Sequence, residues 1–199
     1  MAVGKTYDFG LVKDRFLISR EIENVESVQK FVQQTLNQLP IQRQTDLRQQ
    51  LALKLGQLTA RLHWNGLIHR DYHADNLLMQ VSPEQSVQLW LIDLHAVGVC
   101  RQLTLRHIKR NLSLLSHFFS HYTTKSDRLR FFHSYWSALR DSQNDCESQP
   151  SFLASHRFAQ VVRQTESFCE RAGERASRKG DRKWARGNRR LIIADAPTG

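Results

Sequence analysis

Apolar residues recur at helical spacing through most of the chain, most clearly in the segment that follows Pro40. One apolar stripe there repeats every three or four residues: Leu47, Leu51, Leu55, Leu58 and Leu62. This spacing predicts a helix over residues 42–64 with one apolar face, and Asn65-Gly66 is a signal for its end. A helix with such a face belongs in the core, so we assign it no chemistry.

Shorter patterns precede this helix. Two alternating runs, residues 7–12 and 15–22, predict a β-hairpin with Lys13-Asp14 as its turn. Asn24 has the character of an N-cap, and a helix is predicted from there to Pro40. The apolar positions of that helix are Val25, Val28, Phe31, Val32 and Leu36.

Two β-like runs follow the leucine-striped helix, at residues 77–81 and 87–92. They predict a second hairpin, because residues 82–85 have the composition of a turn. Three further helices are expected. Two are marked by Ile108, Leu112, Leu115 and Phe119, and by Leu129, Phe132, Trp136 and Leu139, and the third covers residues 152–172. The order of elements predicts an α+β fold that is mainly helical.

The length of 199 residues suits one domain, and the 40% of hydrophobic residues allows a real core. No apolar run approaches the roughly 20 residues that span a bilayer, and the first residues are not a secretory signal. We therefore expect a cytoplasmic protein. The net charge is +10, and residues 171–190 hold nine Lys or Arg against Glu174 and Asp181. This basic block predicts a polyanionic partner, although a solvated helix face is an equally simple interpretation.

Three side chains have the identities that phosphoryl transfer needs. Mg²⁺ prefers carboxylate and amide oxygens, which Asp93 and Asn76 could supply from neighbouring strand ends. A second carboxylate nearby, that of Asp71, could accept the proton of an acceptor hydroxyl.

The arrangement of these residues resembles the catalytic loop and metal motif of the protein-kinase-like superfamily. Residues 69–76 read His-Arg-Asp-x4-Asn, and a hydrophobic strand then ends in Asp93. By this resemblance Asp71 is the catalytic Asp, and Asn76 and Asp93 bind the metal. His69 and Arg70 are then structural members of the loop, and His95 replaces the Gly of the Asp-Phe-Gly motif.

The branch of the superfamily is suggested by the same residues. Protein kinases that act on Ser and Thr carry a Lys where this chain has His73, which argues against a protein substrate. The spacing His-x-Asp-x-His-x-x-Asn resembles aminoglycoside and choline kinases. Arg70, the Asp-Leu-His ending at residues 93–95 and the Arg-rich residues 181–191 are more similar to lipopolysaccharide kinases of the Kdo/WaaP family.

That resemblance extends over residues 7–190 and implies a kinase-like C-terminal lobe, mainly helical with a small β-hairpin. Residues 1–23 would be remnant strands of the N-terminal lobe and the hinge, 24–172 the C-terminal lobe, and 173–199 a basic segment. Glu21 and Glu23 would lie at the hinge, beside the nucleotide. A Gly-rich phosphate loop and its strand Lys are not recognisable, so most of the N-terminal lobe is expected to be missing.

The implied activity is transfer of the γ-phosphoryl group of ATP, with Mg²⁺, to a sugar hydroxyl of the lipopolysaccharide inner core. The partner would be a glycolipid or sugar, and Arg171–Arg190 would face an anionic membrane surface at the inner membrane. His73 and His95 would lie near substrate or bond within the loop. The sequence does not predict an oligomeric state.

Four alternatives stay open at this point. The chain could be a small-molecule kinase of the aminoglycoside or choline type, or a catalytically dead kinase-like fragment that acts as a binding module. The net charge allows a nucleic-acid binder, which we do not favour. His69 and His73, four residues apart, could also hold the metal of a phosphohydrolase.

Overall fold

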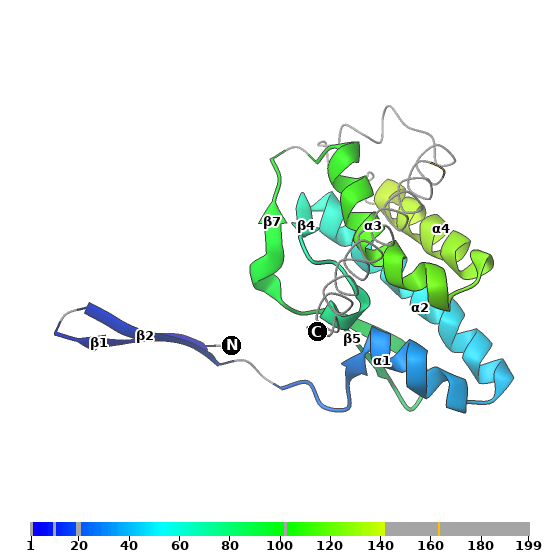
Figure 1. Cartoon of the computed structure of the whole chain (residues 1–199), viewed down its shortest axis with the longest axis horizontal. Coiled ribbons are helices and arrows are strands. Elements are labelled where there is room, and N and C mark those ends of the chain that lie inside the picture. Colours follow the sequence, from blue (N-terminus) through cyan, green and yellow to red (C-terminus); the bar gives the residue numbers. More distant parts are fainter. Residues whose placement is uncertain (1, 10, 19–20, 102, 142–162, 164–199) are drawn as a thin grey trace, which may run out of the picture.

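The computed structural model describes residues 2–9, 11–18, 21–101, 103–141 and 163 (Figure 1). Its elements in chain order are β1 Ala2–Asp8, β2 Leu11–Ile18, β3 Glu26–Ser27, α1 Val28–Lys30, η1 Phe31–Thr35, η2 Leu36–Gln38, α2 Ile41–Trp64, β4 Leu67–His69, η3 Ala74–Asn76, β5 Leu77–Val81, β6 Val87–Leu91, η4 Leu94–Ala96, β7 Val97–Val99, α3 Leu105–Tyr122 and α4 Lys125–Asp141. Arg163 is helical, and the rest of the predicted helix over residues 152–172 lies outside the described residues, as does the basic segment.

The predicted N-terminal hairpin is present as β1 and β2, but its predicted turn is wrong. Asp8 pairs with Leu11, so the chain reverses between them, where Phe9 has a φ of 47°. Tyr7 pairs with Val12 and Thr6 with Asp14, which leaves Lys13 as the extra residue of a β-bulge. Strand β2 therefore continues through Lys13 and Asp14, and the glycine that follows Phe9 is the better turn signal in the sequence.

The helix predicted between Asn24 and Pro40 begins later than Asn24. Asn24 has a φ of 55° and is no cap, whereas the Ser27 hydroxyl accepts a hydrogen bond from the backbone N–H of Lys30. Glu26 and Ser27 pair with β5 before the helix starts, and this pairing shifts the cap by three residues. The helical stretch then ends before Pro40, as predicted.

The other main elements agree with the sequence patterns. Helix α2 runs from Ile41 to Trp64 and is followed by Gly66 at a φ of 67°. Strands β5 and β6 form the predicted hairpin, and α3 and α4 are the two predicted helices. Leu129 is 46% exposed and lies outside the core. No described helix combines the length and apolar character needed to cross a membrane.

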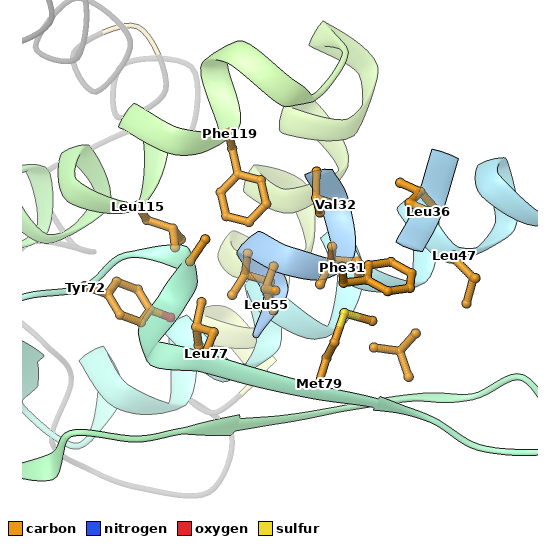
Figure 2. Close-up of a cluster of buried hydrophobic side chains, with 14 residues drawn as sticks. Phe31, Val32, Leu36, Leu47, Leu55, Tyr72, Leu77, Met79, Leu115 and Phe119 are labelled. Atoms are coloured by element: carbon orange, nitrogen blue, oxygen red, sulfur yellow. The ribbon is translucent and has the colours of Figure 1, made fainter. Parts of the chain in front are cut away.

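The core lies where α2 meets the first helical stretch and strand β5. Figure 2 shows side chains from these elements converging, with Leu115 and Phe119 of α3 closing one side. Tyr72 belongs to the same cluster and is completely buried, although it is part of the catalytic-loop motif. The loop is therefore anchored by apolar burial at its centre.

A third sheet was not predicted from the sequence. Strand β4 pairs antiparallel with β7, with Leu67 opposite Val99 and His69 opposite Val97. Each strand has three residues, too short for a period-2 pattern to be recognised. This pair brings the start of the catalytic loop beside the segment that follows Asp93.

Taken together, the elements form a mainly helical α+β body with small antiparallel sheets, as predicted. The division of the chain at residues 23 and 172 stays a prediction.

Candidate active site

The residues of the kinase-like motif gather at one end of the β5–β6 hairpin. Asn76 immediately precedes β5, and its carbonyl accepts a hydrogen bond of 3.0 Å from the backbone N–H of Ile92. Because Asp93 follows Ile92, the hairpin register brings Asn76 and Asp93 to the same end of the sheet. The sequence predicted this meeting of strand ends.

Asp71 and Asn76 are joined directly. The Nδ2 atom of Asn76 donates to the backbone carbonyl of Asp71 at 2.8 Å and lies 3.4 Å from the Asp71 carboxylate. These contacts occupy the amide nitrogen of Asn76. No hydrogen bond joins its Oδ1 atom to any described residue, so this oxygen can serve as a metal ligand.

His73 contacts the same oxygen of the Asp71 carboxylate, Oδ2. Its Nδ1 atom accepts a hydrogen bond from the backbone N–H of Asp75, so the ring proton of the neutral imidazole is on Nε2. Nε2 lies 3.1 Å from Oδ2 of Asp71 and donates to it. His73 therefore orients the carboxylate, which supports a role within the loop.

Asp93 is held in an unusual backbone conformation by His69. Its φ and ψ angles are 61° and 46°, in the left-handed region that few residues other than glycine adopt. The buried His69 ring places Nε2 at 3.1 Å from the backbone carbonyls of both Ile92 and Asp93. The buried His69 ring thus holds the turn at Asp93, and its role as a structural member of the loop stays a prediction.

His95 is a neighbour of the Asp93 carboxylate. Its Nδ1 atom contacts Oδ1 of Asp93, while 84% of the His95 side chain is exposed. An exposed side chain can turn away at little cost, so His95 leaves the carboxylate accessible to a metal ion. A direct contact between His95 and substrate stays a prediction.

Several contacts hold the loop between these residues. The Tyr72 hydroxyl lies 2.8 Å from the Thr59 hydroxyl of α2, and the Ser27 hydroxyl donates to the Asp75 carboxylate at 3.2 Å. The backbone N–H of Arg70 donates to the carbonyl of Ala96, beside β7. Arg70 is otherwise exposed, and its guanidinium extends along Gly98.

Glu21 and Glu23 lie outside this cluster. Neither is in a helix or strand, and the backbone carbonyl of Glu23 accepts a hydrogen bond from the side chain of Gln80 on β5. This contact holds the segment beside β5. A nucleotide contact by either residue stays a prediction.

The donor set fits magnesium and does not fit zinc. Asn76 offers an amide oxygen and Asp93 a carboxylate. Mg²⁺ commonly takes only one or two protein ligands when waters and substrate phosphates complete its shell. No group of three His, Cys, Asp or Glu side chains forms a metal site within the described ranges. The phosphohydrolase alternative is weakened further because the His69 ring is already bonded to two carbonyls.

One contributor to the site was not found from the sequence. Asn111 of α3 donates from Nδ2 to the backbone carbonyl of His69, at the start of the loop. It lies 42 residues away, on a helix predicted only as a packing element. A single Asn on a helix carries no sequence signal for such a contact.

Comparison with known proteins agrees with this arrangement. Among solved structures, a chain described as "WaaP in complex with acyl carrier protein" aligns with a TM-score of 0.52 at 21% sequence identity. The alignment covers 74% of this chain and 59% of that one, so this chain spans less than two thirds of its structural neighbour. At this identity the similarity establishes a shared fold. No curated protein matches.

The family comparison covers the site itself. Residues 4–135 match the lipopolysaccharide kinase (Kdo/WaaP) family, and this range includes Asp71, Asn76 and Asp93. The matched range covers well over half of the sequence. The chain belongs to the lipopolysaccharide kinase (Kdo/WaaP) family.

Proposed function

We propose that this chain transfers the γ-phosphoryl group of ATP to a sugar hydroxyl, with the lipopolysaccharide inner core as the acceptor. The observation that carries the proposal is the joining of Asp71 to Asn76 at the hairpin end where Asp93 also lies. Membership of the lipopolysaccharide kinase family supports both the reaction and the acceptor class.

Each residue of the cluster has a distinct role in this proposal. Asp71 accepts the proton of the acceptor hydroxyl as the hydroxyl oxygen attacks the γ-phosphorus, the bond from that phosphorus to the bridging oxygen breaks and ADP leaves. His73 keeps the Asp71 carboxylate oriented. Asn76 through Oδ1 and Asp93 through its carboxylate would hold Mg²⁺. When bound, Mg²⁺ would neutralise the phosphate oxygens whose charge otherwise repels the attacking hydroxyl.

Calorimetric titration of Mg·ATP into the full chain tests the nucleotide site, with Asp93→Asn as the matched variant. We expect binding that requires Mg²⁺ and is lost in Asp93→Asn, because an amide is a weaker metal ligand than a carboxylate. Asp46→Asn, on the surface of α2, is the control for the loss of one charge. Equal binding by wild type and Asp93→Asn would contradict the role of Asp93.

The acceptor class is tested separately, by phosphoryl transfer from labelled ATP to isolated core oligosaccharide and to a panel of amino sugars and amino alcohols. Turnover of the core oligosaccharide alone would support the proposal. Faster turnover of a soluble amino sugar or choline would instead favour a small-molecule kinase. Mg·ATP binding without transfer to any of these would favour a binding module.

A basic stretch that follows the site along the chain supports an anionic acceptor. Residues 94–126 contain five Lys or Arg and no acidic residue. Arg101, Arg106 and Arg110 are exposed, and none of them forms an ion pair within the described part of the chain. They follow β7, which leads directly from the Asp93 loop. We infer that these residues attract the phosphate or carboxylate groups of the acceptor.

The contact of Arg171–Arg190 with an anionic membrane surface, and an inner-membrane location, remain part of the proposal. Sedimentation with vesicles containing anionic lipid, compared with neutral vesicles, tests them. Binding that needs the anionic lipid and weakens with salt is the expected result.

The structural neighbour suggests one further partner. Its description names a complex with acyl carrier protein, and we propose that this chain can bind the same kind of protein. Size-exclusion chromatography of the two purified proteins together is a direct test. Separate elution at micromolar concentration would contradict the proposal.

A further inference from the structure

A chain of buried polar side chains crosses the helical body and ends at the catalytic loop. Tyr135 of α4 lies 2.8 Å from Nδ1 of His63 on α2, and Nε2 of His63 lies 3.0 Å from Oδ1 of Asn111 on α3. Asn111 then donates to the backbone carbonyl of His69. None of these four residues is more than 3% exposed.

The contacts admit one consistent set of donors and acceptors. The His69 carbonyl can only accept, so Asn111 must present its Nδ2 amide to it and its Oδ1 to His63. His63 must therefore carry its proton on Nε2, and its Nδ1 accepts from the Tyr135 hydroxyl. Burial lowers the pKa of His63 to about 4, which keeps the ring neutral near pH 7.

The far end of this chain reaches the metal-binding strand end. His69 receives Asn111 at its backbone carbonyl, while its ring donates to the backbone carbonyls of Ile92 and Asp93. One residue thus ties α3 to the left-handed turn at Asp93. Asp71 lies only two residues beyond His69. Within the described residues, no hydrogen bond joins Tyr135, His63 or Asn111 to the site carboxylates, so their influence passes through His69.

We propose that Asn111 is a positioning residue for phosphoryl transfer, and that His63 and Tyr135 fix its amide in the orientation that holds the His69 carbonyl. The proposal rests on the proposed function and adds residues to its machinery. An apolar contact at these positions could pack equally well, whereas a satisfied hydrogen-bond chain specifies one arrangement. The hydrogen-bond chain holds Asp71 and Asp93 in a fixed position relative to each other.

Two substitutions break the chain at different points. Asn111→Asp keeps the shape of the side chain but removes the Nδ2 donor and turns an oxygen toward the His69 carbonyl. His63→Leu removes the donor that orients Asn111. For both we expect kcat to fall by about 10²-fold, with KM for Mg·ATP nearly unchanged, because displacement of a catalytic group by about 1 Å has an effect of this size.

The matched variants separate positioning from stability. In His63→Gln the amide nitrogen can occupy the place of Nε2 and donate to Asn111, so this conservative variant should recover most of the kcat that His63→Leu loses. Leu139→Ala removes a completely buried side chain of α4, in the same apolar cluster as Tyr135. It should lower the unfolding midpoint without changing kcat.

Hydrogen exchange gives a readout that needs no acceptor. The backbone amides of Arg70 and Asn76 are bonded to Ala96 and His73. They should exchange faster in Asn111→Asp and His63→Leu than in Leu139→Ala of comparable stability. If the wild type transfers no phosphate, the proposed function fails, yet this difference in exchange would still support the positioning role. Wild-type exchange in both variants, or the same acceleration in Leu139→Ala, would overturn it.

Discussion

The carboxylate of Asp71 is held by His73 and Asn76 through one of its oxygens, while 61% of the side chain is exposed. A carboxylate held on one side and open on the other can meet an incoming hydroxyl. Asp71→Asn should therefore lower kcat by about 10²–10⁴-fold, the usual contribution of a general base. Mg·ATP binding should persist, since the metal ligands are untouched.

Steady-state transfer assays and calorimetry on Asp71→Asn check this expectation, with Asp46→Asn again as the surface control. Wild-type turnover by Asp71→Asn would remove Asp71 from the reaction. Loss of nucleotide binding as well would mean that Asp71 also holds the metal.

His63 makes a second prediction at the residue scale, about acid stability. Burial lowers its pKa from 6.5 to about 4, so the unfolded state takes up a proton first as the pH falls. The stability linked to His63 is therefore complete above pH 6.5 and is lost progressively between about pH 6.5 and pH 4. The loss is about 3 kcal/mol, because each pKa unit corresponds to about 1.4 kcal/mol.

Denaturant unfolding of wild type and His63→Gln between pH 7 and pH 4 measures this loss. The free energy of unfolding should fall less steeply in the variant, which has no titrating group at this position. Parallel curves for the two proteins would show that His63 does not remain neutral in the folded state.

At the scale of elements, α2 and α4 pack so closely that a glycine is required between them. A Cβ atom on Gly56 would lie 2.7 Å from the backbone carbonyl oxygen of Phe131 and 2.8 Å from the backbone nitrogen of Tyr135. The hydroxyl of Ser134 also donates to the carbonyl of Leu53 across the same contact, at 2.7 Å. The position of Tyr135 on α4 thus depends on a close approach of the two helices that Gly56 permits.

Gly56→Ala should destabilise the protein by about 1–3 kcal/mol, because backbone atoms must move to admit the methyl group. Helix propensity alone would give the opposite sign, a gain of about 1 kcal/mol. Chemical denaturation decides between them, with Lys54→Ala on the exposed side of α2 as control. A more stable Gly56→Ala variant would show that the two helices can separate.

At the scale of the whole molecule, the positive charge is spread unevenly over the described surface. Arg106 and Arg110 are one helical turn apart near the start of α3, where a cation is opposed by the helix dipole. We expect the double variant Arg106→Gln/Arg110→Gln to raise the acceptor KM several-fold, at about 0.2–1 kcal/mol per exposed charge. The KM for Mg·ATP should change less.

Kinetics at low and high salt check this, since screening should erase most of the difference between wild type and variant. Arg43→Gln/Lys54→Gln removes the same charge from the exposed surface of α2 and is the matched control. Equal effects from the two double variants would indicate a general attraction, with no special role for α3.

The sequence by itself predicted the main helices, the β5–β6 hairpin and the three residues of the candidate site. Long apolar stripes such as that of α2 define a helix regardless of context, and the spacing of Asp71, Asn76 and Asp93 is set within one local unit. It predicted the N-terminal hairpin with the wrong turn, because a bulge at Lys13 leaves the alternating pattern intact on both sides.

Only the tertiary structure decided what holds that unit in place. The β4–β7 pair, the Ser27 cap that also bonds Asp75, and the path from Tyr135 to His69 all join residues far apart in the chain. Such contacts depend on how helices pack, and a single buried His or Asn has no periodicity that would reveal its partner. Local spacing therefore defined the chemical groups, and helix packing determined how they are oriented.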